Sequence, residues 1–179
     1  MHLSRTFALR IAAAACALLS LAAPMSAPNA AAAKAKFIDR EGRDVGTAQL
    51  TQTASGVLIE LEVRGLQPGE HGFHIHEKGS CDSADGFSSA GSHLAMHGQQ
   101  HGYEAAEGPH AGDLPNQHVG EDGKLRADVI ATSISLEGEQ SVFDEDGAAL
   151  VIHAKADDYR SQPSGEAGER VACAVIEAQ

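Results

Sequence analysis

The stretch 71-HGFHIHEKGSC-81 places two histidines one residue apart in a segment that otherwise resembles a β-strand. Side chains alternate between the two faces of a strand, so His74 and His76 must point to the same face. Phe73 and Ile75 then point to the opposite face, which we predict to be buried in an apolar core. Such a strand forms one wall of a core and presents two imidazoles side by side. This arrangement suits two nitrogen ligands of one metal ion.

Other parts of the chain contain short runs of the same kind. Apolar and polar residues alternate most cleanly in 57-VLIELEVRGL-66, and further runs occur at 36–42, 45–53, 125–131, 149–154 and 171–177. No run shows a sustained 3.6-residue period, and turns rich in Gly, Pro and Asp separate the runs. This pattern predicts an all-β sandwich or barrel.

Two long segments, 77–118 and 154–170, lack the strand pattern. Loops of this length in a compact domain are usually functional or disordered. The first of them contains five of the ten histidines, which favours a functional loop.

Residues 1–33 have the composition of a secretory signal peptide. Arg5 and Arg10 precede the apolar run 11-IAAAACALLSLAA-23, and 30-AAAAK-34 supplies small residues for cleavage. The apolar run is too short to span a membrane. We therefore predict export to the periplasm and no membrane span.

The predicted mature domain is residues 34–179. Lipoprotein processing at Cys16 is an alternative, but the apolar run continues past this cysteine.

The chain has a formal net charge of −12 and becomes more negative by two without Arg5 and Arg10. A strongly acidic protein is poorly suited to nucleic acid or to an anionic membrane surface. An anionic substrate would need a local positive site.

Two cysteines remain in the predicted mature chain, Cys81 and Cys173. An even pair in an exported protein favours a disulfide. The bond would enclose most of the domain, and the chain-entropy model assigns such a loop roughly 4 to 5 kcal/mol of stabilisation.

Eight of the ten histidines fall between positions 71 and 118, and Asp113 follows His110 by three residues. A single histidine would most simply be a polar side chain without special function. The clustering instead indicates a metal site, because imidazole and carboxylate ligands together suit Zn²⁺ or Cu²⁺.

Six motifs, GFHIH, AGSH, HG, PHAGDL, VIHAKADD and ERVAC, occur in this order. Together they resemble copper–zinc superoxide dismutase in its bacterial secreted form, over essentially the whole predicted mature chain. The resemblance implies a Greek-key β-barrel or sandwich with two long functional loops. It also implies the cofactors Cu and Zn. The implied activity is dismutation of superoxide to molecular oxygen and hydrogen peroxide at a redox-cycling copper ion, beside a structural zinc that shares a bridging histidine.

The resemblance implies a role for each matching residue. The copper ligands would be His74, His76, His93 and His153. The zinc ligands would be His93, His101, His110 and Asp113, with His93 bridging both metals and acting in catalysis. Asp157 would link a copper ligand to a zinc ligand, as outer carboxylates often do. Arg170 would attract superoxide beside the copper, and Cys81 and Cys173 would form the family's disulfide.

The sequence departs from the family pattern at several positions. Leu94-Ala95-Met96 follows the bridging histidine where many members have Asn-Pro or Asp-Pro, and Gly102-Tyr103-Glu104 stands where many have a proline. His97 and His118 match no ligand position, and His71 is expected to have a structural role. Every ligand is retained, so these changes bear on the path of the zinc loop.

Rival functions predict different residues. A copper carrier of the same fold would lack a copper ligand or Arg170, and a copper-only relative would lack zinc ligands. A zinc hydrolase would need an open position on zinc, which four protein ligands would close. A non-catalytic adhesion module would not need the histidines. The sequence leaves monomer and homodimer open.

Overall fold

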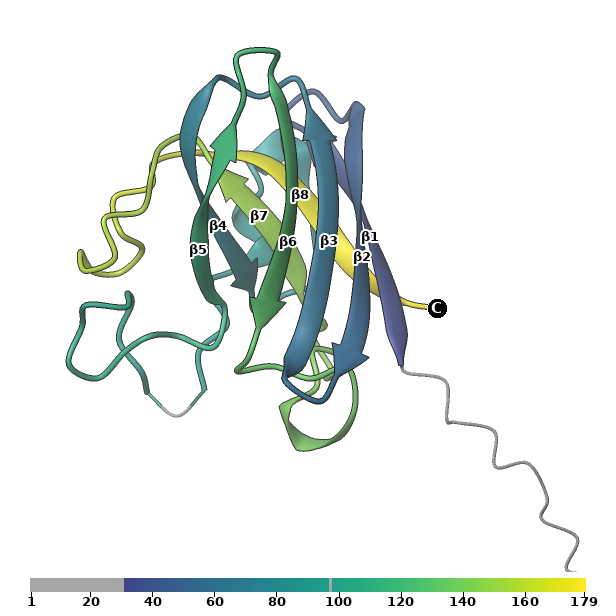
Figure 1. Cartoon of the computed structure of the whole chain (residues 1–179), viewed down its shortest axis with the longest axis vertical. Coiled ribbons are helices and arrows are strands. Elements are labelled where there is room, and N and C mark those ends of the chain that lie inside the picture. Colours follow the sequence, from purple (N-terminus) through teal and green to yellow (C-terminus); the bar gives the residue numbers. More distant parts are fainter. Residues whose placement is uncertain (1–30, 97) are drawn as a thin grey trace, which may run out of the picture.

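The computed structural model describes residues 31–96 and 98–179, which are built mainly from antiparallel strands (Figure 1). The elements are β1 (Ala32–Asp39), β2 (Asp44–Thr53), β3 (Gly56–Arg64), β4 (Gly69–His76), the 3-10 helices η1 (Ser83–Asp85) and η2 (Ser88–Ala90), β5 (Asp113–Val119), β6 (Lys124–Ala131), η3 (Gly138–Gln140), β7 (Ala149–His153) and β8 (Arg170–Ala178). The predicted all-β class is confirmed.

The eight strands form one sheet with the order β5-β4-β7-β8-β1-β2-β3-β6. The edge strands β5 and β6 also pack against each other, so the sheet curls into a nearly closed barrel (Figure 1). Strands β4, β5 and β6 follow one another along the chain and are neighbours in space, whereas β3, which precedes β4 in the chain, pairs with β6 at the far side of this group. This is the Greek-key connection expected from the resemblance.

The barrel interior is filled by the apolar side chains of the alternating strands. In β3, Val57, Ile59 and Val63 are buried, whereas Glu60 and Glu62 are exposed. The predicted alternation of this strand is therefore confirmed. Its register with β2 and β6 is uninterrupted, which keeps the apolar side chains on one face.

Strands β4 and β7 differ from β3 because both of their faces are buried. Phe73 and Ile75 are fully buried in the barrel core, as predicted. The outer face of the β7–β8 region is covered by the segment after β4, whose Phe87 packs into a second apolar cluster with Val151 and Cys173. The long loops therefore enclose this side of the barrel.

Two sequence predictions need correction. The segment 77–118 is not irregular throughout, because β5 occupies its last residues and pairs with β4. Strand β1 begins at Ala32 rather than at residue 36, and Ala33 is fully buried opposite Leu50 of β2. Both segments lack a clear alternating pattern in the sequence, because β5 contains Pro115 and β1 begins with small residues.

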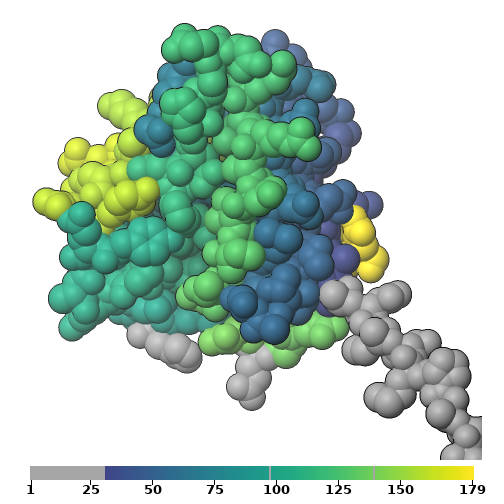
Figure 2. Space-filling view, viewed as in Figure 1, coloured from purple at the N-terminus to yellow at the C-terminus, as the bar shows by residue number. Residues whose placement is uncertain are grey.

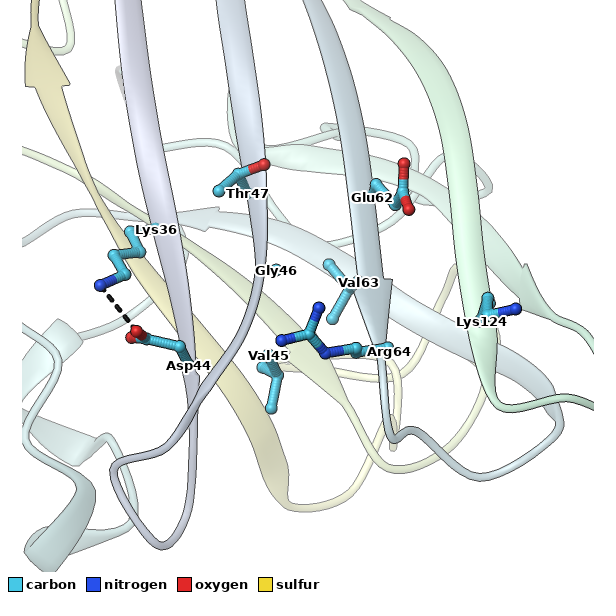
Figure 3. A pocket seen from close by; sticks show the side chains of 9 residues that line it. All are labelled: Lys36, Asp44, Val45, Gly46, Thr47, Glu62, Val63, Arg64 and Lys124. Atoms are coloured by element: carbon cyan, nitrogen blue, oxygen red, sulfur yellow. Dashed lines mark ion pairs between the residues drawn. The ribbon is translucent and has the colours of Figure 1, made fainter.

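A surface cavity of about 470 Å³ lies over the outer face of β1, β2, β3 and β6 (Figure 3). Lys36 and Asp44 form an ion pair of 2.8 Å across it. None of the described histidines lines this cavity, so the cluster of histidines seen in the sequence lies elsewhere. Among the described residues, none forms a helix long and apolar enough to cross a membrane.

Candidate metal centre

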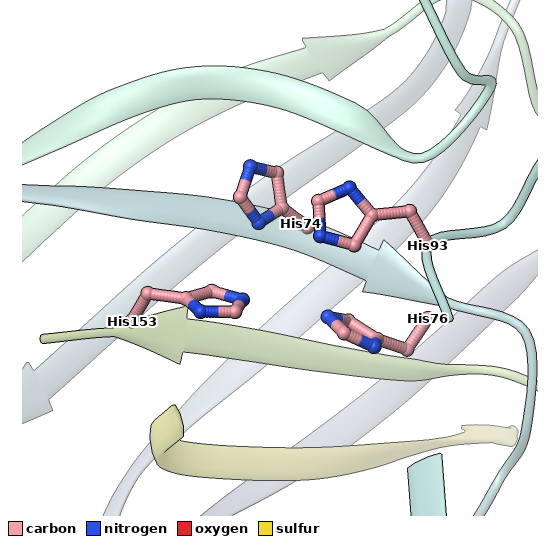
Figure 4. A group of neighbouring side chains, drawn as sticks. All are labelled: His74, His76, His93 and His153. Carbon is pink, nitrogen blue, oxygen red and sulfur yellow. The ribbon is translucent and has the colours of Figure 1, made fainter. Parts of the chain in front are cut away.

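Four histidines from three parts of the chain meet on the outer side of β4 and β7. His74 and His76 come from β4, His153 ends β7, and His93 is held against β4 by a bridge to His76. One ring nitrogen of each histidine lies within 4.8 Å of the corresponding nitrogen of every other. Figure 4 shows the four rings arranged around a common space.

The hydrogen bonds of three of these rings fix which nitrogen carries the proton. His76 Nδ1 lies 3.0 Å from the carbonyl oxygen of Gly91, and His153 Nδ1 lies 3.2 Å from that of Gly168. His74 Nε2 lies 2.8 Å from a carboxylate oxygen of Asp157. These oxygens accept, so each nitrogen donates, and the opposite nitrogen of each neutral ring carries a lone pair.

The nitrogens with free lone pairs are buried without a partner. Among the described residues, no hydrogen-bond partner exists for His74 Nδ1, His76 Nε2, His93 Nε2 or His153 Nε2. A buried polar atom without a partner is costly. Four such atoms that converge on one space fit a metal ion, and an all-imidazole set accommodates copper.

A second group adjoins the first and contains His93, His101, His110 and Asp113, whose ligand atoms also lie within 4.8 Å of one another. Asp113 Oδ1 lies 2.9 Å from His93 Nδ1 and 3.0 Å from His101 Nδ1. Asp113 Oδ2 accepts hydrogen bonds from the backbone N–H groups of Gly102 and His110. Three imidazoles and one carboxylate form a donor set that fits a four-coordinate zinc ion.

His93 belongs to both groups and presents a different nitrogen to each. Its Nδ1 faces Asp113, whereas its Nε2 faces His74, His76 and His153. The rings of His74 and His93 are stacked, with centroids 3.9 Å apart. The geometry is thus suited to one imidazole shared by two ions.

Asp157 connects the two groups from the side of the second long loop. One carboxylate oxygen lies 2.8 Å from His74 Nε2, and the other lies 3.0 Å from His101 Nε2. Asn116 of β5 holds the backbone of Asp157 through two hydrogen bonds of 2.8 Å. His74, His101 and Asp157 also lie close enough to form a third ligand group, but their facing atoms already form hydrogen bonds.

Burial keeps the ligand histidines of the first group neutral. It lowers the pKa of His93 to about 4 and that of His153 to about 3, and it holds the pKa of His76 well below the usual range. Their lone pairs are therefore available at neutral pH without competition from protons.

The two carboxylates behave differently from the neutral histidines. Burial alone would raise the pKa of Asp113 and of Asp157, but hydrogen bonds from His101 and the neighbouring histidines outweigh burial and lower both values. For His101 burial acts in the opposite direction and lowers the pKa. Its hydrogen bonds to the two carboxylates outweigh burial and raise that pKa to about 9 in the metal-free protein.

Arg170 begins β8 and reaches back to the loop that follows β4. Its guanidinium donates hydrogen bonds to the carbonyl oxygens of Phe87 and Gly91, the latter at 2.6 Å. The Gly91 oxygen also accepts from His76 Nδ1. Arg170 is therefore positioned against the same backbone atom as a candidate metal ligand.

A cavity of about 280 Å³ leads to this arginine and to the first histidine group. Its lining residues are Ser92, His93, His153, Pro163, Ser164, Gly168 and Arg170. A small anion that enters the cavity would meet the guanidinium and two of the buried histidines together.

A disulfide joins Cys81 to Cys173, as predicted, with Cα atoms 5.7 Å apart. Cys173 lies three residues after Arg170 in β8, and Cys81 lies in the loop that supplies the two carbonyl acceptors of Arg170. The bond therefore ties the arginine and its acceptors to the same strand.

Two further histidines of the described residues, His71 and His118, lie outside both groups. His118 is exposed and pairs with Glu70 at 2.8 Å. His71 is buried, and its ring nitrogens lie 2.6 Å from the carbonyl oxygen of His153 and 2.8 Å from that of Gln67. It therefore supports the backbone of a candidate ligand, a contact that its position in the sequence does not indicate. His97 lies outside the described residues.

Comparisons with known proteins agree with this architecture. The family model described as "Copper/zinc superoxide dismutase (SODC)" matches residues 45–176. The chain is 48% identical over 147 residues to superoxide dismutase [Cu-Zn] 2 of Aquifex aeolicus, covering 80% of this chain and 85% of that protein. It is 41% identical over 140 residues to superoxide dismutase [Cu-Zn] of Caulobacter vibrioides, covering 76% and 80%.

Solved structures show the same similarity. A superoxide dismutase-like protein from Bacillus subtilis superimposes with a TM-score of 0.76 at 40% identity, covering 79% of this chain and 96% of that one. The Cu/Zn superoxide dismutase from Brucella abortus gives a TM-score of 0.67 at 30% identity, covering 82% and 99%.

The fold and the two adjoining ligand groups define a β-barrel metalloprotein with a paired metal centre. The chain belongs to the copper/zinc superoxide dismutase family. Its activity is the dismutation of superoxide to molecular oxygen and hydrogen peroxide, and its cofactors are copper and zinc.

Proposed function

We propose that the first histidine group holds the redox-active copper and that the second holds zinc, with His93 shared by both. The copper ligands are His74, His76, His93 and His153, and the zinc ligands are His93, His101, His110 and Asp113. The observation that carries this proposal is the convergence of four buried ring nitrogens, which have no partner among the described residues, on one space. Copper supplies one-electron redox chemistry, which zinc lacks.

The residues around the copper group have separate tasks. Arg170 attracts superoxide into the cavity, because a guanidinium stays charged at every relevant pH and can hydrogen-bond an anion. His93 lines the same cavity, and its Nε2 would be the atom able to hold a proton for the peroxide product whenever it is not bound to copper. Asp157 fixes the ring orientations of His74 and His101 from behind.

Metal analysis combined with a dismutation assay tests this proposal. The purified protein, loaded with both metals, should contain one copper and one zinc per chain and should consume superoxide at a rate proportional to its copper content. Zinc in both sites with full activity, or a rate independent of copper, would contradict the assignment. A copper carrier would bind the metal without the activity.

We further propose that residues 1–33 are a signal peptide, that residues 34–179 form the metal-binding domain, and that the protein acts in the periplasm. The composition of the first 33 residues supports export, and a relative 41% identical over 140 residues is named an extracellular superoxide dismutase, from Haemonchus contortus. Strand β1 begins at Ala32, so cleavage after residue 33 would remove its first two residues, whereas cleavage before Ala32, within the same stretch of small residues, would keep the strand whole and move the start of the domain by two residues. The intact mass of protein from the periplasmic fraction tests this proposal.

The oligomeric state is a separate question. A homodimer is compatible with the fold, and sedimentation of the metal-loaded protein distinguishes it from a monomer.

A further inference from the structure

The two long loops meet beside the zinc-ligand group, at a point where the chain departs from the family pattern. The side chain of Gln162 makes two hydrogen bonds with the backbone of His101. It accepts from the N–H at 2.9 Å and donates to the carbonyl oxygen at 2.8 Å. Gly102 has a φ of +98°, and a Cβ atom there would lie 2.0 Å from the carbonyl oxygen of Tyr159. Glycine is therefore needed for this close approach of the loops.

The only two tyrosines of the chain pack against each other across this junction. The ring centroids of Tyr103 and Tyr159 are 5.4 Å apart and the ring planes meet at 64°, a favourable edge-to-face arrangement. The Tyr103 hydroxyl donates to the carbonyl oxygen of Asp113 at 2.8 Å, and the Tyr159 hydroxyl accepts from the N–H of Asn116 at 2.8 Å. The aromatic pair is thus fastened to β5 at the candidate zinc ligand Asp113.

Further contacts strengthen the junction. The N–H of Glu104 donates to the carbonyl oxygen of Tyr159 at 3.0 Å, and the Glu104 carboxylate pairs with Arg160. Both charged side chains are exposed, so the ion pair itself contributes little. Tyr159 has a φ of +64°, a conformation that is unfavourable for a residue with a side chain. The surrounding contacts offset this cost and direct the ring toward Tyr103.

We infer that Tyr103, Glu104, Tyr159 and Arg160 form a loop clasp that closes the first long loop over the zinc ligands and slows the loss of zinc. This inference rests on the proposed zinc assignment. His101 is fully buried and Asp113 is 5% exposed, so an ion held between them leaves only when the loop opens locally. Residues 102–104 must then move away from residues 159–160, which breaks the clasp contacts.

The rate of zinc release to a chelator in excess tests the clasp in the copper- and zinc-loaded protein. Tyr103→Ala and Tyr159→Ala should each release zinc roughly threefold to tenfold faster, the range expected for loss of an aromatic pair. The effects in the double variant should be less than additive, because either single substitution already removes the ring–ring contact and only the separate hydroxyl hydrogen bonds add to the double variant. Tyr103→Phe keeps the ring and should restore most of the difference between Tyr103→Ala and wild type.

Matched controls separate the clasp from general destabilisation. Lys124→Ala breaks an exposed ion pair with Asp122 on another part of the barrel and should release zinc at the wild-type rate. Copper content should stay unchanged in all variants.

Wild-type zinc release in both alanine variants, or additive effects in the double variant, would overturn the clasp while leaving the proposed function intact. Wild-type protein that binds copper but no zinc would overturn the zinc assignment and the clasp with it.

Discussion

At the scale of single residues, the site depends on which nitrogen of each buried histidine ring is hydrogen-bonded and which is left with a free lone pair. His74 Nε2 is hydrogen-bonded to Asp157, and the Nδ1 atoms of His76 and His153 are hydrogen-bonded to backbone carbonyls. The opposite ring nitrogen of each histidine therefore keeps a lone pair that is directed at the common space. A substitution that preserves the imidazole but removes the outer acceptor should therefore weaken metal binding without removing a ligand.

Arg170 is the residue whose replacement should slow catalysis while both metal sites stay filled. Arg170→Ile should lower the dismutation rate roughly tenfold or more at low salt, because electrostatic guidance of an anion typically has this size. Arg170→Lys should be intermediate, since it keeps the charge but loses the planar fork that bonds Phe87 and Gly91. The measurement is the rate at matched copper and zinc content across ionic strength.

Arg126→Ile is the control for this series, because it removes the same charge from the exposed face of β6. The difference between Arg170→Ile and wild type should shrink as salt is added, since the Debye length is roughly 8 Å at physiological ionic strength. Equal rates for Arg170→Ile and wild type at low salt would show that Arg170 has no role in guidance.

At the scale of elements, strand β4 carries the main constraint. Its inner face supplies Phe73 and Ile75 to the barrel core, and its outer face supplies His74 and His76. The 77–112 and 154–169 loops must cover that outer face, because imidazoles on an uncovered strand would be solvated. The disulfide and the Arg170 hydrogen bonds hold the first of these loops in place.

Loss of the disulfide should affect both stability and capture of superoxide. Cys81→Ser should lower the free energy of unfolding by about 2 to 5 kcal/mol, because the bond closes a loop of 92 residues. Denaturant unfolding of the metal-loaded protein measures this change. The dismutation rate should also fall, because the carbonyl acceptors of Arg170 lie in the released loop. Unchanged stability would mean that the packing of Phe87 and the Arg170 hydrogen bonds hold the loop without the disulfide.

Most strand positions, and the residues that the structure gathers into the two candidate ligand groups, could be predicted from the sequence, because alternation and local motifs encode them. The alternation of residues 57–63 and the HIH spacing in β4 are examples. β5 was missed because its pattern is interrupted by Pro115 and its pairing with β4 is irregular. Some supporting hydrogen bonds join segments that are distant in the sequence, so no local pattern reveals them. Gln162 binds the backbone of His101, Asn116 binds the backbone of Asp157, and the Gly91 carbonyl accepts from His76.

At the scale of the whole molecule, the protein is acidic, with a formal charge of −12, yet its substrate is an anion. In the proposed function, the cavity lined by Arg170 would supply the positive site that the anion needs, because clefts focus the field of the charges that line them. The barrel provides a rigid frame for that cavity, whose lining comes from the ends of β7 and β8 and from the two long loops.

The stability of the metal-free protein should be greatest near pH 6.5. The pKa values of His93 and His153 are lowered to about 4 and about 3. Below pH 6.5 these two histidines therefore bind protons in the unfolded chain but not in the folded chain, and the free energy of unfolding falls as the pH decreases. The pKa of His101 is raised to about 9, so its stabilising contribution is complete below pH 6.5 and is lost as the pH rises through 9.

Urea unfolding of the metal-free protein between pH 4 and pH 9 measures this profile. Zinc should remove the decline on the alkaline side, because zinc replaces the proton on His101. A stability that continues to rise up to pH 9 without metal would contradict the environment described for His101.

The central claim is the division of one site into a redox copper group and a structural zinc group. The most direct test compares the copper content, zinc content and dismutation rate of His153→Ala and Asp113→Ala with those of wild type. His153→Ala should lose most of the activity and much of the copper while keeping zinc. Asp113→Ala should lose zinc and retain part of the copper-dependent activity. Equal loss of activity in both variants with copper occupancy intact would contradict the division.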